Sequence, residues 1–229
     1  MNNTKRFHDR QQAGSLLAER LMPYAGQSDT IVLAIPRGGV PVGAVLAHAL
    51  DLPLDVLLVR KLGVPGHEEY AMGAIASGGL CVLHEEALRL LDIPLSDVEE
   101  VARRETAEIA RREILYRDSR PAPTLCGRTV LLVDDGLATG ATMQAAVELV
   151  RQAGPRRVVV AVPVAAPDSC RKLETIADEV ACLRMPQPFH AVSLWYENFD
   201  QTSDDEVCRL IAEARSAGSA ASEQSALPP

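Results

Sequence analysis

A chain of 229 residues with 47% hydrophobic content can bury one core of ordinary size, so we expect one domain rather than two. The formal net charge of −8 disfavours nucleic acid as a partner, because contacts with a phosphate backbone require clustered lysines and arginines. A long apolar run and a basic, apolar leader with a cleavage site are both absent from the sequence. We therefore expect a cytoplasmic protein that does not enter a membrane.

The first elements along the chain are predicted to be a helix and then a strand that ends in a glycine turn. Apolar residues at helical spacing within 7–21 favour a helix that docks on the core. The run 30–35 is typical of a buried strand, and a second helix is expected over 40–50. Between them lies the loop Arg37-Gly38-Gly39, whose bare backbone and guanidinium suit phosphate oxygens. Taken alone, such a turn is more often structural.

A further strand, predicted over 54–59, ends in two cations, Arg60 and Lys61. Residues 62–79 then have the glycine and proline content of a mobile loop. Two cations at a strand end are unusual at a buried edge, which favours a functional role. A solvated strand terminus is the alternative.

A hairpin and a charged helix are expected next. Residues 72–83 are predicted to turn back on themselves at Gly78 and Gly79. Ser96 and Glu99 have the spacing of a capping box, which predicts the start of a long helix. Most charges of this helix are spaced for surface ion pairs, so we expect it to face solvent or a dimer partner.

The stretch 130–142, VLLVDDGLATGAT, carries the strongest chemical signal. A short β-branched strand ends in adjacent carboxylates, Asp134 and Asp135, and a helix is predicted over 141–153. The N terminus of that helix can bind an anion through its unpaired N–H groups. The carboxylates can accept hydrogen bonds from vicinal hydroxyls or hold a divalent cation. A ribose 5-phosphate satisfies both requirements.

Other interpretations of this stretch are weaker. A Walker-type phosphate loop needs a lysine where Ala141 stands, and the dinucleotide motif GxGxxG is absent because the glycines are Gly136 and Gly140. The two acids could merely cap the helix and solvate the loop. Capping, however, needs one side chain rather than an adjacent pair.

The alternation of strands and helices predicts an α/β fold with a Rossmann-like parallel sheet flanked by helices. The expected strands are 30–35, 54–59, 129–133, 157–164 and 179–183. In such sheets ligands bind at the carboxyl ends of the strands. All three candidate loops lie at those ends.

VLLVDDGLATGAT resembles the phosphoribosyl pyrophosphate motif of the type I phosphoribosyltransferases. The resemblance implies that Asp134 and Asp135 bind the ribose 2- and 3-hydroxyls. It implies that the 5-phosphate is wrapped by Ala138, Thr139, Gly140, Ala141 and Thr142. The upstream turn is similar to the family's pyrophosphate loop, which assigns substrate binding to Arg37, Gly38 and Gly39. The whole chain is most similar to a bacterial group of predicted phosphoribosyltransferases with no assigned acceptor.

The activity implied is transfer of phosphoribose from 5-phosphoribosyl 1-pyrophosphate to a small nitrogen-containing acceptor, for which a nucleobase is one candidate, with release of pyrophosphate. Arg60 and Lys61 match the basic pair that begins the family's flexible loop, and with Mg²⁺ they would stabilise the leaving diphosphate. Asp135 completes the catalytic candidates, because a carboxylate beneath the sugar stabilises its cationic transition state. Asp134 and Asp135 are also candidate Mg²⁺ ligands, mostly through water or substrate. Ala138 replaces the aspartate base of 6-oxopurine members, so the acceptor stays open.

The resemblance also implies a single domain over 1–215, with an insertion at about 63–120 and a hood built from the N-terminal segment and about 185–210. Three aromatic residues of the hood are candidates for stacking on an acceptor base: Phe189, Trp195 and Tyr196. A packed core plug is the alternative for them. Residues 216–229 are rich in Ala and Ser, and we expect them to be disordered. A homodimer is expected.

A sensor that keeps the same pocket and acts through a protein partner is the alternative to an enzyme. Some family members that bind nucleic acid act in that way, although the acidic charge of this chain disfavours a nucleic-acid partner. The pair Arg60 and Lys61 favours the enzyme, because a pure sensor has less need of a basic closing loop.

Overall fold

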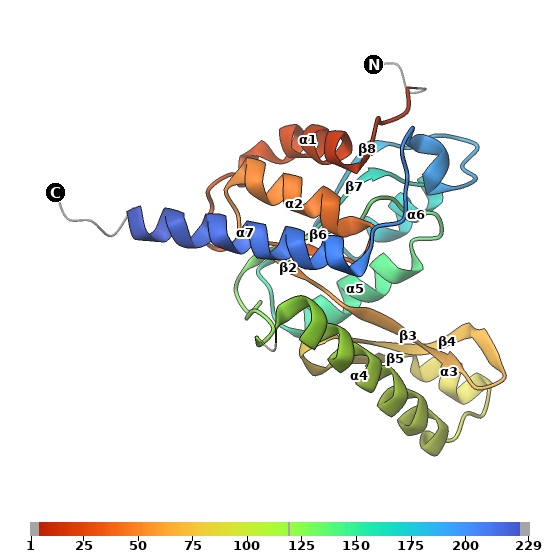
Figure 1. Cartoon of the computed structure of the whole chain (residues 1–229). Helices are drawn as coiled ribbons and strands as arrows, with labels where there is room; N and C mark the ends of the chain where they lie inside the picture. Colours follow the sequence, from red (N-terminus) through yellow and green to blue (C-terminus); the bar gives the residue numbers. More distant parts are fainter. Residues whose placement is uncertain (1–4, 119, 225–229) are drawn as a thin grey trace.

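The structure is a computed structural model that describes residues 5–118 and 120–224. Its main sheet has five parallel strands in the order β2-β1-β6-β7-β8 (Figure 1). These strands are β1 (Thr30–Ala34), β2 (Leu54–Val56), β6 (Thr129–Val133), β7 (Arg157–Val164) and β8 (Glu179–Arg184). The predicted α/β fold and its five strands are confirmed, although β2 ends three residues earlier than expected.

Helices cover both faces of this sheet. One face carries α1 (Arg10–Leu21), α2 (Gly39–Leu50) and α7 (Asp204–Gln224), and the other carries α5 (Ala141–Gln152) and α6 (Pro167–Leu173). Within β6, Leu131 and Val133 pack on the first face, whereas Val130 and Leu132 pack on the second. A strand buried on both sides needs apolar residues at every position, which explains why this strand has no polar alternation.

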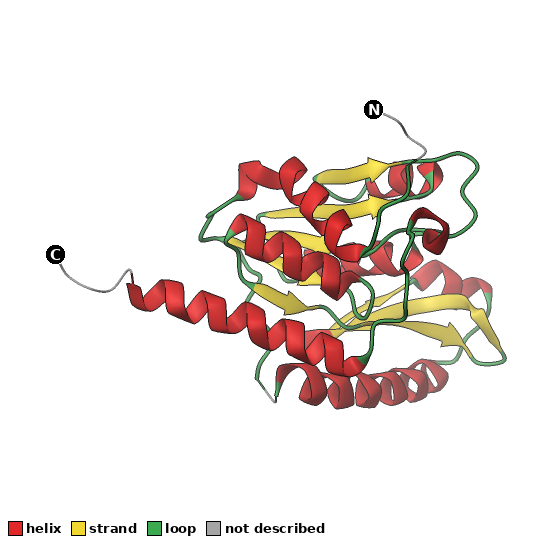
Figure 2. Cartoon of the chain, turned by 45° about the horizontal axis from the view of Figure 1, so that its top comes forward, coloured by secondary structure: helices red, strands yellow, loops and turns green. Residues whose placement is uncertain are grey.

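The insertion forms a second, antiparallel sheet with two helices. Its strands are β3 (Val59–Val64), β4 (His67–Ala76) and β5 (Leu80–Leu83), followed by α3 (Glu85–Leu90) and α4 (Leu95–Arg117). The predicted hairpin is confirmed, with positive φ angles of 78° and 77° at Gly78 and Gly79. Figure 2 shows this small sheet as a separate layer beside the main one.

Two expectations about the insertion are wrong. Residues 62–79 are not an irregular mobile loop, because β3 pairs with β4 over most of its length. The glycine and proline content instead marks the turn between these two strands and a bulge within them. The helix α4 begins at Leu95 without a side-chain cap, and Ser96 donates its hydroxyl to Asp97 rather than closing a capping box.

A buried arginine anchors α4 to the main sheet. The Arg117 side chain is only 1% exposed. Its Nε donates to Asp55 on β2 at 2.9 Å, and its Nη1 donates to Glu113 at 2.6 Å. A buried guanidinium requires such paired carboxylates, because an unpaired buried charge is costly. The charged helix therefore lies partly inside the protein and is not simply a solvated face.

The N-terminal segment and the segment near Tyr196, from which the hood is expected to be built, pack on each other. Phe7 forms a β-bridge with Tyr196, and both belong to a separate apolar cluster that includes Ala13 and Val164. The N-terminal helix begins at Arg10, later than position 7, because Asp9 caps it by accepting the N–H of Gln12.

The C-terminal helix α7 extends past the body of the molecule (Figure 1, Figure 2). It continues to Gln224, so the expectation of disorder from 216 onward is wrong for 216–224, and 225–229 lie outside the described residues. No helix within 5–118 and 120–224 has the length and apolar character needed to cross a membrane.

Candidate active site

The site is built on two neighbouring parallel strands. In the register of β1 and β6, Ala34 lies opposite Val133, so the two strands end at the same level. The N–H of Ile35 donates to the carbonyl of Val133 at 2.8 Å, which continues the pairing by one residue. The loop with Arg37 and the loop with the acid pair therefore leave the sheet side by side, as expected for the carboxyl edge of a parallel sheet.

Gly38 and Gly39 are needed for contact between these loops. A Cβ on Gly38 would lie 2.0 Å from the Oδ2 of Asp135. A Cβ on Gly39 would lie 2.7 Å from the carbonyl of Val133 and 2.9 Å from the Cα of Asp134. All three distances are shorter than any side chain tolerates, so the glycines allow the close approach of the two loops. The sequence predicted close approach to a ligand, and the structure adds this contact with the carboxylates.

The acid pair lies in a partly buried environment. The Oδ1 of Asp134 accepts the N–H of Asp135 at 2.8 Å. Burial, together with the charge of Asp135, raises the pKa of Asp134 well above its ordinary value. Burial also raises the pKa of Asp135, although a neighbouring arginine opposes that shift. Such carboxyls can bind ribose hydroxyls, which restore the hydrogen bonds lost from water.

That neighbouring arginine is Arg10, which sequence reasoning missed. Its Nε lies 2.9 Å from the Oδ2 of Asp135, and both side chains are almost buried, at 12% and 13% exposure. Arg10 belongs to the first turn of α1, and no motif around it distinguishes it from a surface arginine. Only the packing of α1 on the main sheet brings it to the acid pair.

The proposed phosphate end lies at the N terminus of α5. Gly140 precedes this helix with a φ of 72°, and Thr139, Ala141 and Thr142 are exposed. The carbonyl of Ala138 accepts the hydroxyl of Ser169 at 2.7 Å, which holds the loop in place. The first N–H groups of a helix are unpaired within it, so this end can bind an anion.

The expected cations lie on different elements. Arg37 is half exposed, and its Nη1 lies 3.8 Å from the carboxylate of Asp204 at the start of α7. The sequence analysis places Arg60 and Lys61 at the end of a strand of the main sheet. They lie instead within β3, a strand of the small sheet. Arg60 donates to Glu105 of α4 at 2.8 Å. Because neighbouring residues of a strand point to opposite sides, Lys61 faces the other side of the small sheet.

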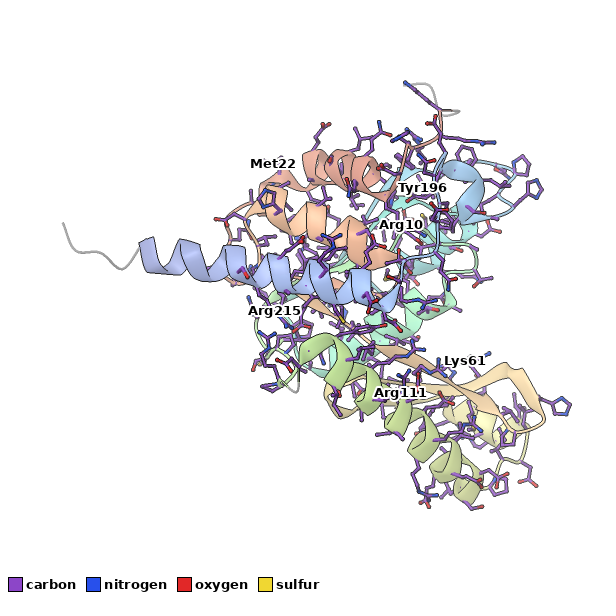
Figure 3. All side chains as sticks on the ribbon, in the orientation of Figure 1. Arg10, Met22, Lys61, Arg111, Tyr196 and Arg215 are labelled. Carbon is purple, nitrogen blue, oxygen red and sulfur yellow. The ribbon has the colours of Figure 1, made fainter. Side chains whose placement is uncertain are left out.

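Figure 3 shows Lys61 on the small sheet, while Arg10 and Tyr196 lie close together near the hood. Arg10 and Asp135 are brought into direct contact. Arg60 is paired with Glu105 of α4 rather than with the acid pair.

The Tyr196 ring is not open to an acceptor base. It is 2% exposed and packs between Phe7 and Phe199, with ring centroids 5.4 Å and 4.9 Å away. Its hydroxyl donates to the carbonyl of Asp135 at 2.6 Å. The interpretation of this ring as a stacking surface is therefore wrong, and the alternative of a core plug holds for it.

Phe189 and Trp195 pack on the same apolar cluster but keep part of their surface exposed. Trp195 also lines a cavity of about 280 Å³ together with Arg6, Pro188, His190 and Leu194. None of the residues that line this cavity belongs to the two loops of the main sheet. An acceptor role for Phe189 and Trp195 stays a prediction.

Comparison with known proteins decides the family. The model of the phosphoribosyl transferase domain matches residues 66–196, which is more than half of the chain and includes the acid pair. The chain belongs to this family. The resemblance to type I phosphoribosyltransferases is thereby confirmed.

This phosphoribosyl transferase domain is similar to proteins from several bacteria. Two curated relatives from two strains of Mycobacterium tuberculosis, each named a putative phosphoribosyl transferase, are 44% identical to it over 210 residues. The alignment covers 92% of this chain and 47% of each relative, so the chain spans about half the length of the curated relatives it matches. The crystal structure of TT1426 from Thermus thermophilus is 47% identical, with 91% of this chain and 98% of that chain covered and a TM-score of 0.82.

The phosphoribosyl transferase domain offers no complete metal cage among its described residues, because they contain no group of three or more His, Cys, Asp or Glu side chains suited to a metal ion. Asp134 and Asp135 nevertheless fit Mg²⁺ in a shared site. Mg²⁺ is commonly held by one or two carboxylates together with substrate phosphates and water. The two carboxylates would supply the protein part of such a donor set.

Proposed function

We propose that this chain binds 5-phosphoribosyl 1-pyrophosphate with Mg²⁺ and transfers its phosphoribose to a nitrogen acceptor, releasing pyrophosphate. The observation that carries the proposal is the contact between the two loops, where Gly38 lies directly against the carboxylate of Asp135. It supports a single continuous site at the carboxyl ends of β1 and β6. The family membership supports transferase chemistry of this type.

Within that site the residues have distinct tasks. Asp134 and Asp135 would accept hydrogen bonds from the ribose hydroxyls, and the N terminus of α5 would hold the 5-phosphate. Arg37 would bind the diphosphate through its planar fork of N–H donors. Binding energy at both phosphates would orient C1 of the ribose toward the acceptor, which lowers the entropic part of the barrier.

Charge governs the step itself. The leaving diphosphate gains negative charge while the ribose becomes cationic, so a carboxylate beneath the sugar and cations around the diphosphate both stabilise the transition state. Mg²⁺, when bound, would neutralise charge on the diphosphate oxygens. Arg60 and Lys61 would add to this only after the small sheet has moved toward the loops, because Arg60 is paired with Glu105.

The proposal is tested by isothermal titration calorimetry with 5-phosphoribosyl 1-pyrophosphate and Mg²⁺. We expect binding to the unmodified chain and none to the variant carrying Asp134→Asn with Asp135→Asn, at unchanged thermal stability. Glu100→Gln, which alters an exposed acid of α4, is the control. Equal affinity of the double variant and the unmodified chain would contradict the ribose assignment.

Transfer is tested separately from binding. Nucleobases and small amines are screened with Mg²⁺ and the sugar donor for release of pyrophosphate. Binding without release for any acceptor would favour the alternative of a sensor that acts through a protein partner. The homodimer stays a prediction, which light scattering can check.

A further inference from the structure

One arginine of the hood reaches a carboxylate of the acid pair. Arg10 lies at the start of α1, and its guanidinium makes three contacts with elements far away in the sequence. Nε donates to the Oδ2 of Asp135 at 2.9 Å, and Nη1 donates to the carbonyl of Asp200 at 2.8 Å. The same group lies over the ring of Phe199, with Cζ 3.9 Å from the ring centroid.

These contacts fix the guanidinium in position. Two hydrogen bonds define its plane, and the aromatic ring below it removes the remaining freedom to tilt. The Arg10 side chain is 12% exposed, so water screens its charge poorly. A planar fork held in this way can impose an orientation on its carboxylate partner, whereas an exposed lysine could not.

The Asp135 carboxylate is also confined by Gly38. The bare Cα of Gly38 lies so close to Oδ2 that a Cβ there would be 2.0 Å away. The backbone carbonyl of Asp135 also accepts the Tyr196 hydroxyl at 2.6 Å. The hood therefore holds both the side chain and the backbone of this residue.

Charge balance gives a second reason for the arginine. Asp134 and Asp135 are adjacent, and the proposed donor is itself a polyanion. Two uncompensated carboxylates would repel it at short range, and burial strengthens that repulsion. One cation beside Oδ2 leaves the pair with a smaller net charge while other lone pairs of the carboxylate remain able to accept hydroxyl groups.

We propose that Arg10 is a positioning residue, which holds the Asp135 carboxylate in the orientation that binds the ribose hydroxyls of the donor. It acts through Asp135 and need not touch the substrate. The proposal rests on the proposed function and extends it, because it makes the hood a part of the donor site.

The test compares three probes on the intact chain by calorimetry: 5-phosphoribosyl 1-pyrophosphate with Mg²⁺, ribose 5-phosphate, and pyrophosphate with Mg²⁺. In Arg10→Gln, the two ribose ligands should bind about tenfold or more weakly, as expected for loss of a charge-assisted hydrogen bond. Pyrophosphate should bind as to the unmodified chain. Arg20→Gln, an exposed arginine of the same helix, should change none of the three.

Each outcome separates the inference from the proposed function. Unchanged binding of the ribose ligands, or an equal loss for pyrophosphate, would overturn the positioning role while leaving the proposed function intact. Failure of the unmodified chain to bind either ribose ligand would overturn both. If Arg10→Gln does not fold, Arg10→Lys serves in its place, because it retains a cation beside Asp135. It should show a smaller loss with the same selectivity for ribose ligands, and an unselective loss would overturn the positioning role.

Discussion

The Cα of Gly38 lies against the Oδ2 of Asp135, although 97 residues separate them in the chain (135 − 38). A side chain at position 38 would occupy the space of the carboxylate. The loop with Gly38 and the acid pair are therefore one packed unit, and a change in one displaces the other.

Gly38→Ala should disrupt this unit. The added Cβ would lie 2.0 Å from the carboxylate, so Asp135 must move and lose its contact with Arg10. We expect a destabilisation of about 1–3 kcal/mol and loss of donor binding, measured by thermal unfolding and calorimetry. Gly26→Ala is the contrast, since Gly26 has a φ of 66° but no atoms within 4 Å of its added Cβ. It should lower stability without altering ligand affinity, and an equal effect on binding would argue against a specific contact at Gly38.

Arg37→Ala should distinguish the two ends of the donor. Arg37 lies on the loop after β1, with its Nη1 3.8 Å from Asp204, and its side chain is 36% exposed. Affinity for the diphosphate-bearing donor should fall about tenfold or more, because a charge-assisted contact to phosphate is lost. Affinity for ribose 5-phosphate should change little. Equal losses for the two ligands would remove Arg37 from the diphosphate site.

Tyr196 should behave as a structural residue of the hood. Tyr196→Phe keeps the ring between Phe7 and Phe199 but removes the hydroxyl that donates to the carbonyl of Asp135. We expect a loss of about 1 kcal/mol in the free energy of unfolding. Tyr196→Ala should cost about 3–5 kcal/mol, because a buried ring leaves a cavity. Denaturant titration measures both, and equal stability of the two variants would contradict a packed ring at this position.

Glu105 should make the stability of the insertion depend on pH. Burial alone would raise its pKa, but hydrogen bonds from Arg60 and Arg104 outweigh burial and lower the pKa. The pKa of Glu105 is lower in the folded than in the unfolded protein. Ionised Glu105 therefore contributes its full stabilisation of the fold at pH values above its unfolded pKa of about 4.3. The stabilisation is lost as the pH falls through the folded value.

The measurement is thermal unfolding of Glu105→Gln and the unmodified chain between pH 7 and pH 3. At pH 7 the variant should be less stable by about 1 kcal/mol, since both arginine partners are partly exposed. The difference should shrink below about pH 4. Glu99→Gln, at an exposed position of the same helix, should show no such dependence. If the difference in stability between the two proteins stays constant with pH, the ionised form of Glu105 does not stabilise the fold.

The candidate site was predictable where its signals are local. The run Val130 to Val133 is apolar at each position, and the acids and glycines that follow it are contiguous in the chain. The same holds for the hairpin at Gly78 and Gly79, whose turn chemistry depends on adjacent residues. The parallel arrangement then follows, since strands that alternate with helices place their carboxyl ends at one edge.

The errors arose where a residue's role depends on distant partners. The glycines within 62–79 are as typical of a loop as of two bulged strands, and only the pairing of β3 with β4 decides between them. The aromatic residues near the C terminus were equally compatible with stacking and with core packing. Burial of Tyr196 against Phe7 decided for packing.

The sequence by itself determined the strands of the main sheet, the acid pair and the glycine-containing loop that follows it, because periodicity and turn preference act over a few residues. Only the tertiary structure decided that Arg10 binds Asp135 and that Arg60 binds Glu105, across 125 and 45 residues respectively. Such contacts leave no local pattern, since an arginine that will be buried against a carboxylate has the same neighbours in sequence as one that will face water. Their free energy comes from the exclusion of water when helices pack on sheets, and that exclusion exists only in the folded chain.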